Sequence, residues 1–395
     1  MPPELERALL NAGTPPGGKW REWVEAKNSK ARARNRWREL QVYDATATMS
    51  GDMVMFSSND YLGLSVHPKV KAAAMQAVRR WGAGAGSARL LGGTRPVHAE
   101  LEDALASWKI AERALVFPSG YAANLGVLSA IAGPGTLVCS DELNHASIVD
   151  GCRLARSMGS EVKNYPHCDA SAVAGLLEAW PGRAVVVTDA VFSMDGDWAP
   201  LEDLARICVA YGALLVVDEA HSVLGPHFRA GAPGPVPLEG EQIVRVGTLS
   251  KMLGSQGGFV CAASSMVDLL VNRCRPFIFT TALAPASAAG ALAALDVLRS
   301  PEGSTLLARL EGHCRTLVPK AEHPSPIVAV MTGSEQAALD AAEALRVKGL
   351  YVPAVRPPTV PPGQSRLRIS LSAAHTRADV EGLRSALRDL GLLGT

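Results

Sequence analysis

From about residue 56 to residue 300, the chain alternates short apolar, β-rich runs with helical runs. The helical runs include Val97–Ile110, His145–Met158 and Leu201–Tyr211, in which apolar residues recur at spacings of three and four. The strand-like runs are continuously apolar, as expected where helices cover both faces of a sheet. They are Ala114–Phe117, Thr136–Cys139, Ala184–Thr188, Ala213–Val217, Ile243–Gly247 and Gly258–Ala262. This alternation predicts an α/β fold with a mostly parallel sheet between two layers of helices.

A second, smaller unit of α+β type is predicted after about residue 300. It begins with a helix and continues with two strands and two further helices, around a proline-rich loop at Val355–Gly363. The expected elements are the strand Pro326–Met331, the helix Glu335–Val347, the strand Arg366–Leu371 and the helix Arg377–Leu390. We therefore divide the chain into residues 1–55 (a helical arm and a segment of the small domain), 56–300 (the large domain) and 301–395 (the small domain).

Composition excludes several classes of protein. With 39 basic and 38 acidic residues, the chain has no global field for gripping nucleic acid or an anionic membrane, and 48% apolar residues argue against disorder. The long uncharged stretches 114–140 and 276–295 are interrupted by proline and by glycine or threonine, which favours buried strands and helices over membrane spans. Seven scattered cysteines without a Cys-x-x-Cys spacing suggest a reducing compartment, and residues 1–6 show no signal-peptide pattern. We expect a soluble, cytoplasmic protein without nucleic-acid or membrane partners.

Residues 19–40 form a basic arm with eight basic and three acidic residues. The arm is either a solvated helical face or a segment that lends an arginine to an anionic ligand. Its basic residues are Lys19, Arg21, Lys27, Lys30, Arg32, Arg34, Arg36 and Arg38.

In a parallel sheet of this type, chemistry collects in the loops that follow the carboxyl ends of the strands. After the first predicted strand, Ser119-Gly120-Tyr121 opens a helix, and a helix start preceded by glycine offers free backbone N–H groups to a phosphate. The same residues are also compatible with an ordinary turn and helix cap.

Asp218-Glu219-Ala220-His221 follows another strand and has the form of an ATPase acidic motif. An ATPase would also need a glycine-rich loop that ends in Gly-Lys-Ser/Thr, but Gly18-Lys19 is followed by Trp20. A dinucleotide fingerprint is incomplete at Gly82–Gly86, and no Gly-x-Ser-x-Gly elbow is present. These three classes of enzyme are therefore disfavoured.

Thr248-Leu-Ser-Lys251 follows the next strand, within an otherwise uncharged stretch from Gly247 to Val267. A partly desolvated lysine has a lowered pKa and forms Schiff bases with carbonyl groups. Lys251, the acid Asp218 on a neighbouring strand end and the phosphate-ready helix start at Gly120 together indicate pyridoxal 5′-phosphate (PLP).

At these motifs the chain resembles the α-oxoamine synthases, which are fold-type I PLP-dependent transferases. The resemblance implies a large domain with a seven-stranded, mostly parallel sheet, a smaller C-terminal α+β domain, and a homodimer with the active site at the subunit interface. The motifs that carry it lie at Phe56–Leu64, Pro118–Asn124, Asn144–Ser147, Val191–Asp197, Asp218–His221 and Thr248–Lys251.

The resemblance also implies a role for individual residues. Lys251 would hold the cofactor and then remove the α-proton of the amino acid, Asp218 would pair with the pyridinium nitrogen, and His145 would stack on the ring or, alternatively, cap a helix. The other cofactor contacts would be Ser193 and His221 near O3′, Gly120, Tyr121 and Thr248 at the phosphate, and Thr280 or Thr281 from the other subunit. Arg368 would bind the amino-acid carboxylate, and Thr359 and Arg34 would contact the acyl substrate.

Within the family, the stretch from Arg356 to Thr376 is most similar to the branch that forms 8-amino-7-oxononanoate in biotin synthesis. That branch implies condensation of L-alanine with a pimeloyl thioester, carried by coenzyme A or by an acyl carrier protein. A related synthase that uses glycine or serine, and an inactive scaffold subunit, are the alternatives. Family subunits of the inactive kind typically lack the lysine that is present here as Lys251. The chain departs from the family pattern at Asp189-Ala190, in a glycine-poor loop after His221, and between Gly312 and Pro326, which predicts a trimmed small domain.

Overall fold

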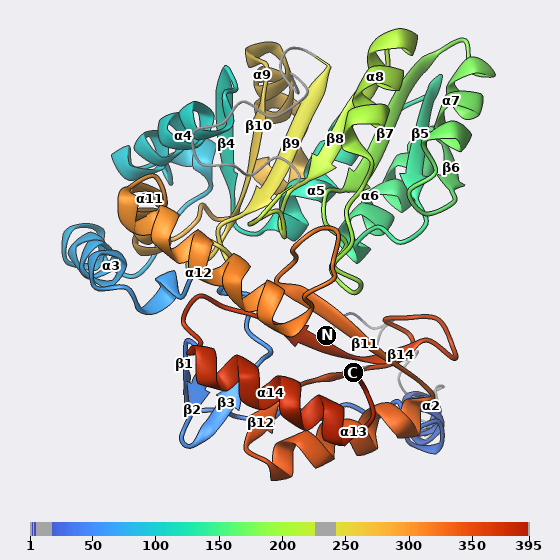
Figure 1. The fold of residues 1–395 in the computed structure, drawn as a ribbon. Helices are drawn as coiled ribbons and strands as arrows, with labels where there is room; N and C mark the ends of the chain where they lie inside the picture. The colour runs from blue at the N-terminus through green and yellow to red at the C-terminus, as the bar shows by residue number, and fades with distance from the viewer. Residues whose placement is uncertain (1, 3, 5–17, 226–241, 394–395) are drawn as a thin grey trace.

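The computed structural model describes residues 18–225 and 242–393, together with Pro2 and Glu4. Most of residues 1–17 and most of the loop after His221 therefore lie outside the described residues. Figure 1 shows a large domain built around one sheet and a smaller domain beside it, with α12 (Pro301–Leu317) running between the two.

The central sheet has seven strands in the order β4-β10-β9-β8-β7-β5-β6, as the predicted fold class requires. All of the strands are parallel except β10, which pairs antiparallel with both of its neighbours. The strands are β4 (Arg113–Phe117), β5 (Thr136–Asp141), β6 (Glu161–Tyr165), β7 (Arg183–Asp189), β8 (Leu214–Asp218), β9 (Ile243–Thr248) and β10 (Gly258–Ala262).

Six of these strands were predicted to within two residues at each end, but β6 was missed. Its sequence, Glu-Val-Lys-Asn-Tyr, lacks an apolar run because β6 is an edge strand in which only Tyr165 is fully buried, whereas β4, at the opposite edge, is covered and keeps its apolar run. Edge strands tolerate polar and charged side chains because solvent reaches them on the unpaired side.

Helices cover both faces of the sheet, and alternate side chains of β7 pack against the two helical layers. Val185 and Val187 belong to one apolar cluster, together with residues of α5 and α6, whereas Val186 belongs to another that includes residues of α7 and α8. Successive side chains of a strand point to opposite faces, so one apolar run supplies both cores. The helices of this domain are α3 (Pro68–Trp81), α4 (Pro96–Lys109), α5 (Gly120–Ile131), α6 (Ala146–Ser157), α7 (Ala170–Glu178), α8 (Leu201–Tyr211), α9 (Ser264–Arg273), α10 (Arg275–Ile278) and α11 (Pro285–Leu298).

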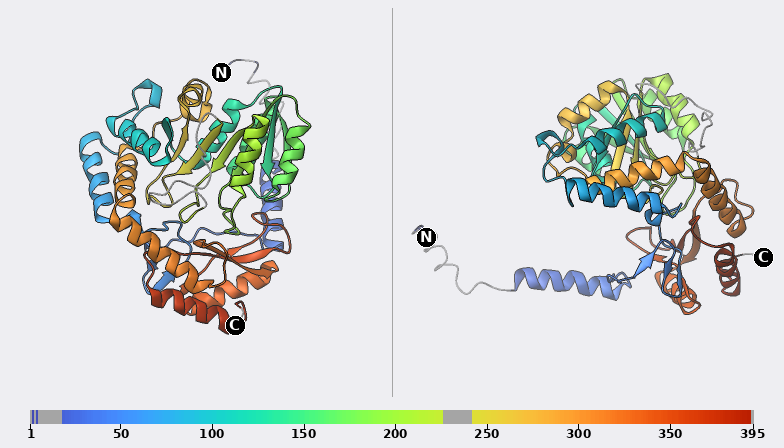
Figure 2. Two further views of the ribbon diagram at one scale, coloured as in Figure 1. Left: turned by 45° about the horizontal axis from the view of Figure 1, so that its top comes forward. Right: turned by 90° about the vertical axis from the view of Figure 1, so that its left-hand side faces the viewer.

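The small domain combines C-terminal and N-terminal segments. Its three-stranded antiparallel sheet has the order β11-β14-β13, and the short strand β12 pairs in parallel with β3, which lies just before residue 56. The helix α2 (Lys19–Ala33) has no buried residue and extends away from the body of the molecule (Figure 2). The remaining elements are β1 (Ala45–Thr46), β2 (Met49–Ser50), β3 (Met53–Met55), β11 (Ile327–Gly333), α13 (Glu335–Val347), β12 (Leu350–Tyr351), β13 (Ala354–Val355), β14 (Ser365–Ser370) and α14 (Arg377–Asp389), with 3₁₀ turns at Leu64–Val66 and Arg89–Leu91.

Candidate active site

Lys251 lies in a tight turn that follows β9. The turn is closed by a hydrogen bond of 2.9 Å from the Gly254 N–H to the Lys251 carbonyl oxygen. Gly254 has φ +56°, and a Cβ at that position would lie 2.2 Å from the backbone nitrogen of Ser65, so glycine is required there. Burial lowers the pKa of Lys251, and the negative charges of Asp218 and Asp189 oppose that shift. The amine is therefore closer to its nucleophilic, neutral form than an exposed lysine would be.

Asp218 ends β8, and its side chain is buried and held on both oxygens. Oδ2 accepts a hydrogen bond of 2.6 Å from Asn124 Nδ2, and Oδ1 accepts one of 2.9 Å from the Ala220 N–H. Asn124 comes from α5 and also donates to the Ser147 hydroxyl at 3.0 Å. These contacts fix the carboxylate at the edge of the sheet where Lys251 lies.

His145 lies between these groups and the start of α6. Its backbone N–H donates to Asp189 Oδ2 at 2.7 Å, and its Nδ1 lies 2.7 Å from the Ser147 hydroxyl. The ring also accepts from the Ser147 N–H, so His145 caps α6 as well as facing the site. Burial lowers the pKa of His145, whereas burial and then Asp218 raise the pKa of Asp189 well above its ordinary value.

The start of α5 and the end of β9 meet at a corner that offers backbone N–H and hydroxyl groups, the donor types that suit an anion. Ser119 caps α5 by accepting from the Ala122 N–H at 3.1 Å, which leaves the first N–H groups of the helix, at Gly120 and Tyr121, without partners inside the helix. A Cβ on Gly120 would lie 3.4 Å from the Thr248 side chain, so the two segments approach closely. The Thr248 hydroxyl lies 2.7 Å from that of Ser250, which adds a second hydroxyl to the corner.

Tyr121 directs its hydroxyl away from this corner, toward Asp150. Its ring centroid lies 6.4 Å from that of His145, in an edge-on arrangement. The backbone of Tyr121 and its ring thus face different neighbours, and the structure supports its backbone N–H as the group available to an anion.

Arg368, on β14 of the small domain, reaches the large domain. Its Nε donates to the Ser193 carbonyl oxygen at 2.5 Å, Nη1 donates to the Ser370 hydroxyl at 2.7 Å, and both Nη atoms lie 3.3 Å from Asn59 Oδ1. Burial raises the pKa of the neighbouring Tyr61 to about 12, and the charge of Arg368 and a hydrogen bond with it oppose that shift. The planar guanidinium is suited to a bidentate contact with a carboxylate.

His221 is buried beside the same site. Its Nδ1 lies 2.5 Å from the hydroxyl of Tyr61, which is fully buried. Burial, followed by the positive charge of Lys251, holds the pKa of His221 well below its ordinary value. A neutral ring at this position can exchange a hydrogen bond with a ligand without bringing a second positive charge.

Four of the predicted residues, Thr280, Thr281, Arg34 and Thr359, come from segments other than the strand ends that carry Lys251 and Asp218. In the described part of the chain, no hydrogen bond or ion pair joins them to Lys251 or Asp218. Thr280 and Thr281 follow α10, where Thr281 forms an isolated bridge with Ala88. Arg34 is exposed at the end of α2, and Thr359 accepts a hydrogen bond of 2.8 Å from Arg38 instead.

Glu219, the second acid of the Asp-Glu-Ala-His motif, points away from the site. Its carboxylate lies 2.6 Å from Lys109 Nζ and 3.8 Å from Arg245 Nε, in a buried cluster of charges. A carboxylate paired in this way is not offered to a metal–nucleotide complex, which agrees with the exclusion of an ATPase.

The donor set fits PLP at each of its three functional ends. Lys251 would supply the amine for the aldehyde carbon, Asp218 would supply the carboxylate for the pyridinium nitrogen, and the α5 corner would supply N–H and hydroxyl groups for the phosphate. The fold and these residues together define a fold-type I PLP-dependent transferase.

Comparisons with known proteins place the chain within that class. A family model for aminotransferase class I and II matches residues 51–387. The 8-amino-7-oxononanoate synthase of Anaeromyxobacter dehalogenans is 50% identical over 344 residues, which cover 85% of each chain. The chain belongs to the aminotransferase class I and II family and, within it, to the α-oxoamine synthases, and it is similar to 8-amino-7-oxononanoate synthases of that group.

Solved structures agree with this placement. A structure of SPT with PLP has a TM-score of 0.84 at 31% identity and covers 95% of this chain and 100% of its own. The 8-amino-7-oxononanoate synthase of Francisella tularensis has a TM-score of 0.71 at 26% identity, with 86% and 98% covered. In the described residues, no helix is both long enough and apolar enough to span a membrane.

Residues that support the site were not assigned from the sequence. Asn124, Tyr61 and Asn59 all lie in motifs that pointed to the family, but their partners come from distant segments. The usable signal was their position: a polar side chain inside an apolar helix, such as Asn124 in α5, is expected to have a buried partner.

Proposed function

We propose that this protein catalyses the PLP-dependent condensation of L-alanine with a pimeloyl thioester, with loss of carbon dioxide. The products are 8-amino-7-oxononanoate and the free thiol of the carrier, as in biotin synthesis. The observation that carries the proposal is the convergence of Lys251, Asp218 and Arg368 at one sheet edge, in a chain 50% identical to a synthase of that name.

The bound cofactor would supply an electron-withdrawing ring that stabilises negative charge at the amino-acid α-carbon. Asp218 would keep the ring nitrogen protonated, because a buried carboxylate held by Asn124 favours a proton on its partner. Arg368 would bind the amino-acid carboxylate, and the amine of Lys251 would take the α-proton. His145 would cover one face of the ring, and His221 and Ser193 would lie on the O3′ side.

The overall reaction balances without an oxidant or reductant. A carbon–carbon bond forms between the alanine α-carbon and the acyl carbon of the thioester as the carbon–sulfur bond breaks. The carboxylate then leaves as carbon dioxide, and a proton replaces it at the α-carbon. Lys251 would move the protons at that carbon.

We propose that the active enzyme is a homodimer in the cytoplasm, in which Thr280 or Thr281 completes the phosphate site of the partner subunit. The exposed apolar side chains Leu91 and Phe279 beside these threonines support the proposal, because they would be covered in a dimer. The cysteines are all unpaired, as expected in a reducing compartment. We further propose that Arg34 and Thr359 contact the acyl substrate.

The test is to incubate the PLP-loaded protein with pimeloyl-CoA or pimeloyl-acyl carrier protein and with alanine, glycine, serine or threonine. We expect thiol release and 8-amino-7-oxononanoate formation with alanine, and the faster thioester identifies the carrier. Lys251→Ala should abolish turnover and the visible absorbance of the protein-bound cofactor. An unchanged spectrum in that variant would refute the proposed role of Lys251, and a preference for glycine or serine would favour the related synthases.

A further inference from the structure

The turn 193–197 after β7 joins the two domains at the site. It is closed by hydrogen bonds from the Phe192 N–H to the Asp197 carbonyl oxygen (3.0 Å) and from the Gly196 N–H to the Phe192 carbonyl oxygen (2.8 Å). Gly196 has φ +80°, and a Cβ there would lie 2.2 Å from the Ile327 carbonyl oxygen of the small domain. The backbone of the turn is therefore pressed directly against β11.

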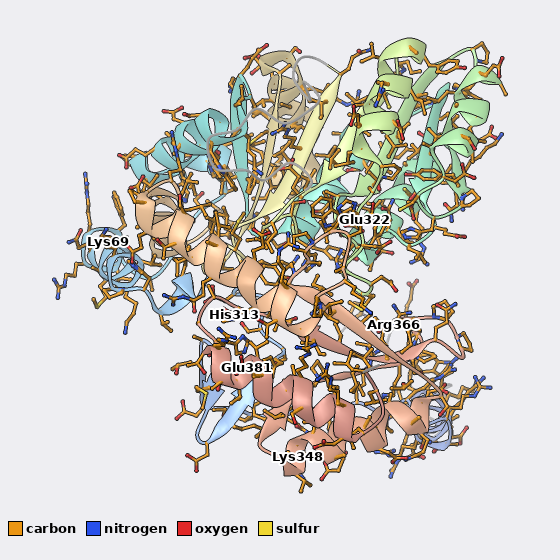
Figure 3. The ribbon with its side chains drawn as sticks, viewed as in Figure 1. Lys69, His313, Glu322, Lys348, Arg366 and Glu381 are labelled. Atoms are coloured by element: carbon orange, nitrogen blue, oxygen red, sulfur yellow. The ribbon has the colours of Figure 1, made fainter. Side chains whose placement is uncertain are left out.

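Two arginines of β14, in the small domain, form hydrogen bonds and an ion pair with this turn. Arg366 and Arg368 are two residues apart and so lie on the same face of the strand. Arg368 donates to the Ser193 carbonyl oxygen, whereas Arg366 pairs with the Asp195 carboxylate and donates to the Met194 carbonyl oxygen at 3.4 Å. Figure 3 shows Arg366 on the small domain, at the boundary with the large one.

The other side of the turn is held by the large domain. Asp197 Oδ2 lies 2.6 Å from His167 Nε2, and the Nδ1 of that ring lies 3.0 Å from the buried Asp141. Asp195 and Asp197 thus point to opposite sides, one to each domain. Both domains therefore hold the turn through side-chain contacts.

We propose that the Arg366–Asp195 ion pair is a positioning device for the amino-acid carboxylate site. The side chain of Arg366 is only 3% exposed, so its charge is compensated by Asp195 and not by solvent. This pairing ties the turn to β14. The position of the turn sets the position of the Ser193 carbonyl oxygen, which accepts the hydrogen bond from Arg368 Nε. Arg366 and Asp195 act through Arg368 and need not touch the substrate.

The inference rests on the proposed function, because it takes an amino-acid carboxylate as the ligand of Arg368. The experiment measures the alanine dissociation constant of the PLP-loaded protein from its visible absorbance, together with the thioester KM and the unfolding temperature. Asp195→Asn should raise the alanine dissociation constant about tenfold, since a charged hydrogen-bonded pair is broken, and should leave the thioester KM within about twofold. Glu381→Gln, which removes an exposed ion pair with Arg377 on the same domain, is the matched control and should change neither value.

A double-mutant cycle separates positioning from general stability. Arg368→Ala should weaken alanine binding about 100-fold, and adding Asp195→Asn in that background should weaken it by less than about twofold. Multiplicative effects, or a wild-type dissociation constant in Asp195→Asn, would overturn the inference. If Asp195→Asn does not fold, Arg366→Lys keeps a cation beside Asp195 and should show a rise of about threefold and the same non-additivity.

The outcomes distinguish this inference from the proposed function. If the wild type responds to glycine or serine but not to alanine, the proposed substrate is wrong and the cycle is repeated with the amino acid that binds. If the wild type binds alanine and the cycle is additive, only the positioning role fails. If no amino acid binds, both are refuted.

Discussion

Lowering the pH from 7 to 4 should weaken the fold through His375, which lies in the loop after β14. Its side chain is 3% exposed and stacks on Phe56 with ring centroids 4.3 Å apart. Nδ1 accepts from the Ser372 N–H at 2.9 Å, and Nε2 lies 3.2 Å from the Met55 carbonyl oxygen. Because one nitrogen accepts and the other donates, the native contacts require the neutral ring.

Burial lowers the pKa of His375 from 6.5 to about 4, against the opposing effects of the Met55 carbonyl oxygen and of Asp379. In the unfolded chain the ring takes up a proton near pH 6.5, so between the two values the unfolded state binds more protons. The contribution of His375 to the free energy of unfolding is therefore complete above pH 6.5 and is lost as the pH falls to about 4. The two pKa values lie about 2.5 pH units apart, which corresponds to about 3 kcal/mol.

The assay is urea unfolding, followed by circular dichroism at several pH values between 7 and 4. The pH-dependent loss of unfolding free energy should be about 3 kcal/mol smaller in His375→Gln than in the wild type, because that variant cannot take up the proton. His323→Gln changes a half-exposed ring and should leave the slope as in the wild type. The reasoning is refuted if the stability of His375→Gln falls with pH as steeply as that of the wild type.

Three further predictions concern the site and its support. Asn124→Ala removes the 2.6 Å hydrogen bond to Asp218 and should weaken PLP binding about tenfold, measured by fluorescence titration. An affinity for PLP equal to that of the wild type would contradict this prediction. Gly254→Ala forces a Cβ against backbone atoms at φ +56° and should lower the free energy of unfolding by more than about 1 kcal/mol. Gly382→Ala is the control, because that glycine lies in open space on α14, and the change should be neutral or stabilising. Equal effects of the two changes would contradict the steric argument. Glu219→Gln should cost about 3 kcal/mol of unfolding free energy, since it leaves buried cations undercompensated, and a neutral result would show that the pair does not stabilise the fold.

Much of the site could be located from the sequence because of one property of parallel sheets. Asp218 and Lys251 each follow an apolar run, and the carboxyl ends of such strands meet at one edge. Strand ends could be placed to within two residues because burial on both faces leaves a continuous apolar signal. The edge strand β6 has no continuous apolar run. The antiparallel direction of β10 could not be predicted, because its residues do not differ in type from those of the parallel strands.

The sequence by itself therefore determined the class of fold, the order of its elements and the strand ends at which chemistry is placed. The tertiary structure alone decided which side chains meet: Asn124 with Asp218, Tyr61 with His221, and Arg366 with Asp195 across the domain boundary. The physical reason is the sequence separation over which each kind of interaction acts. Periodic burial depends on neighbours within a few residues, whereas these pairs join segments 94 to 171 positions apart, and their contact depends on how strands and domains are packed.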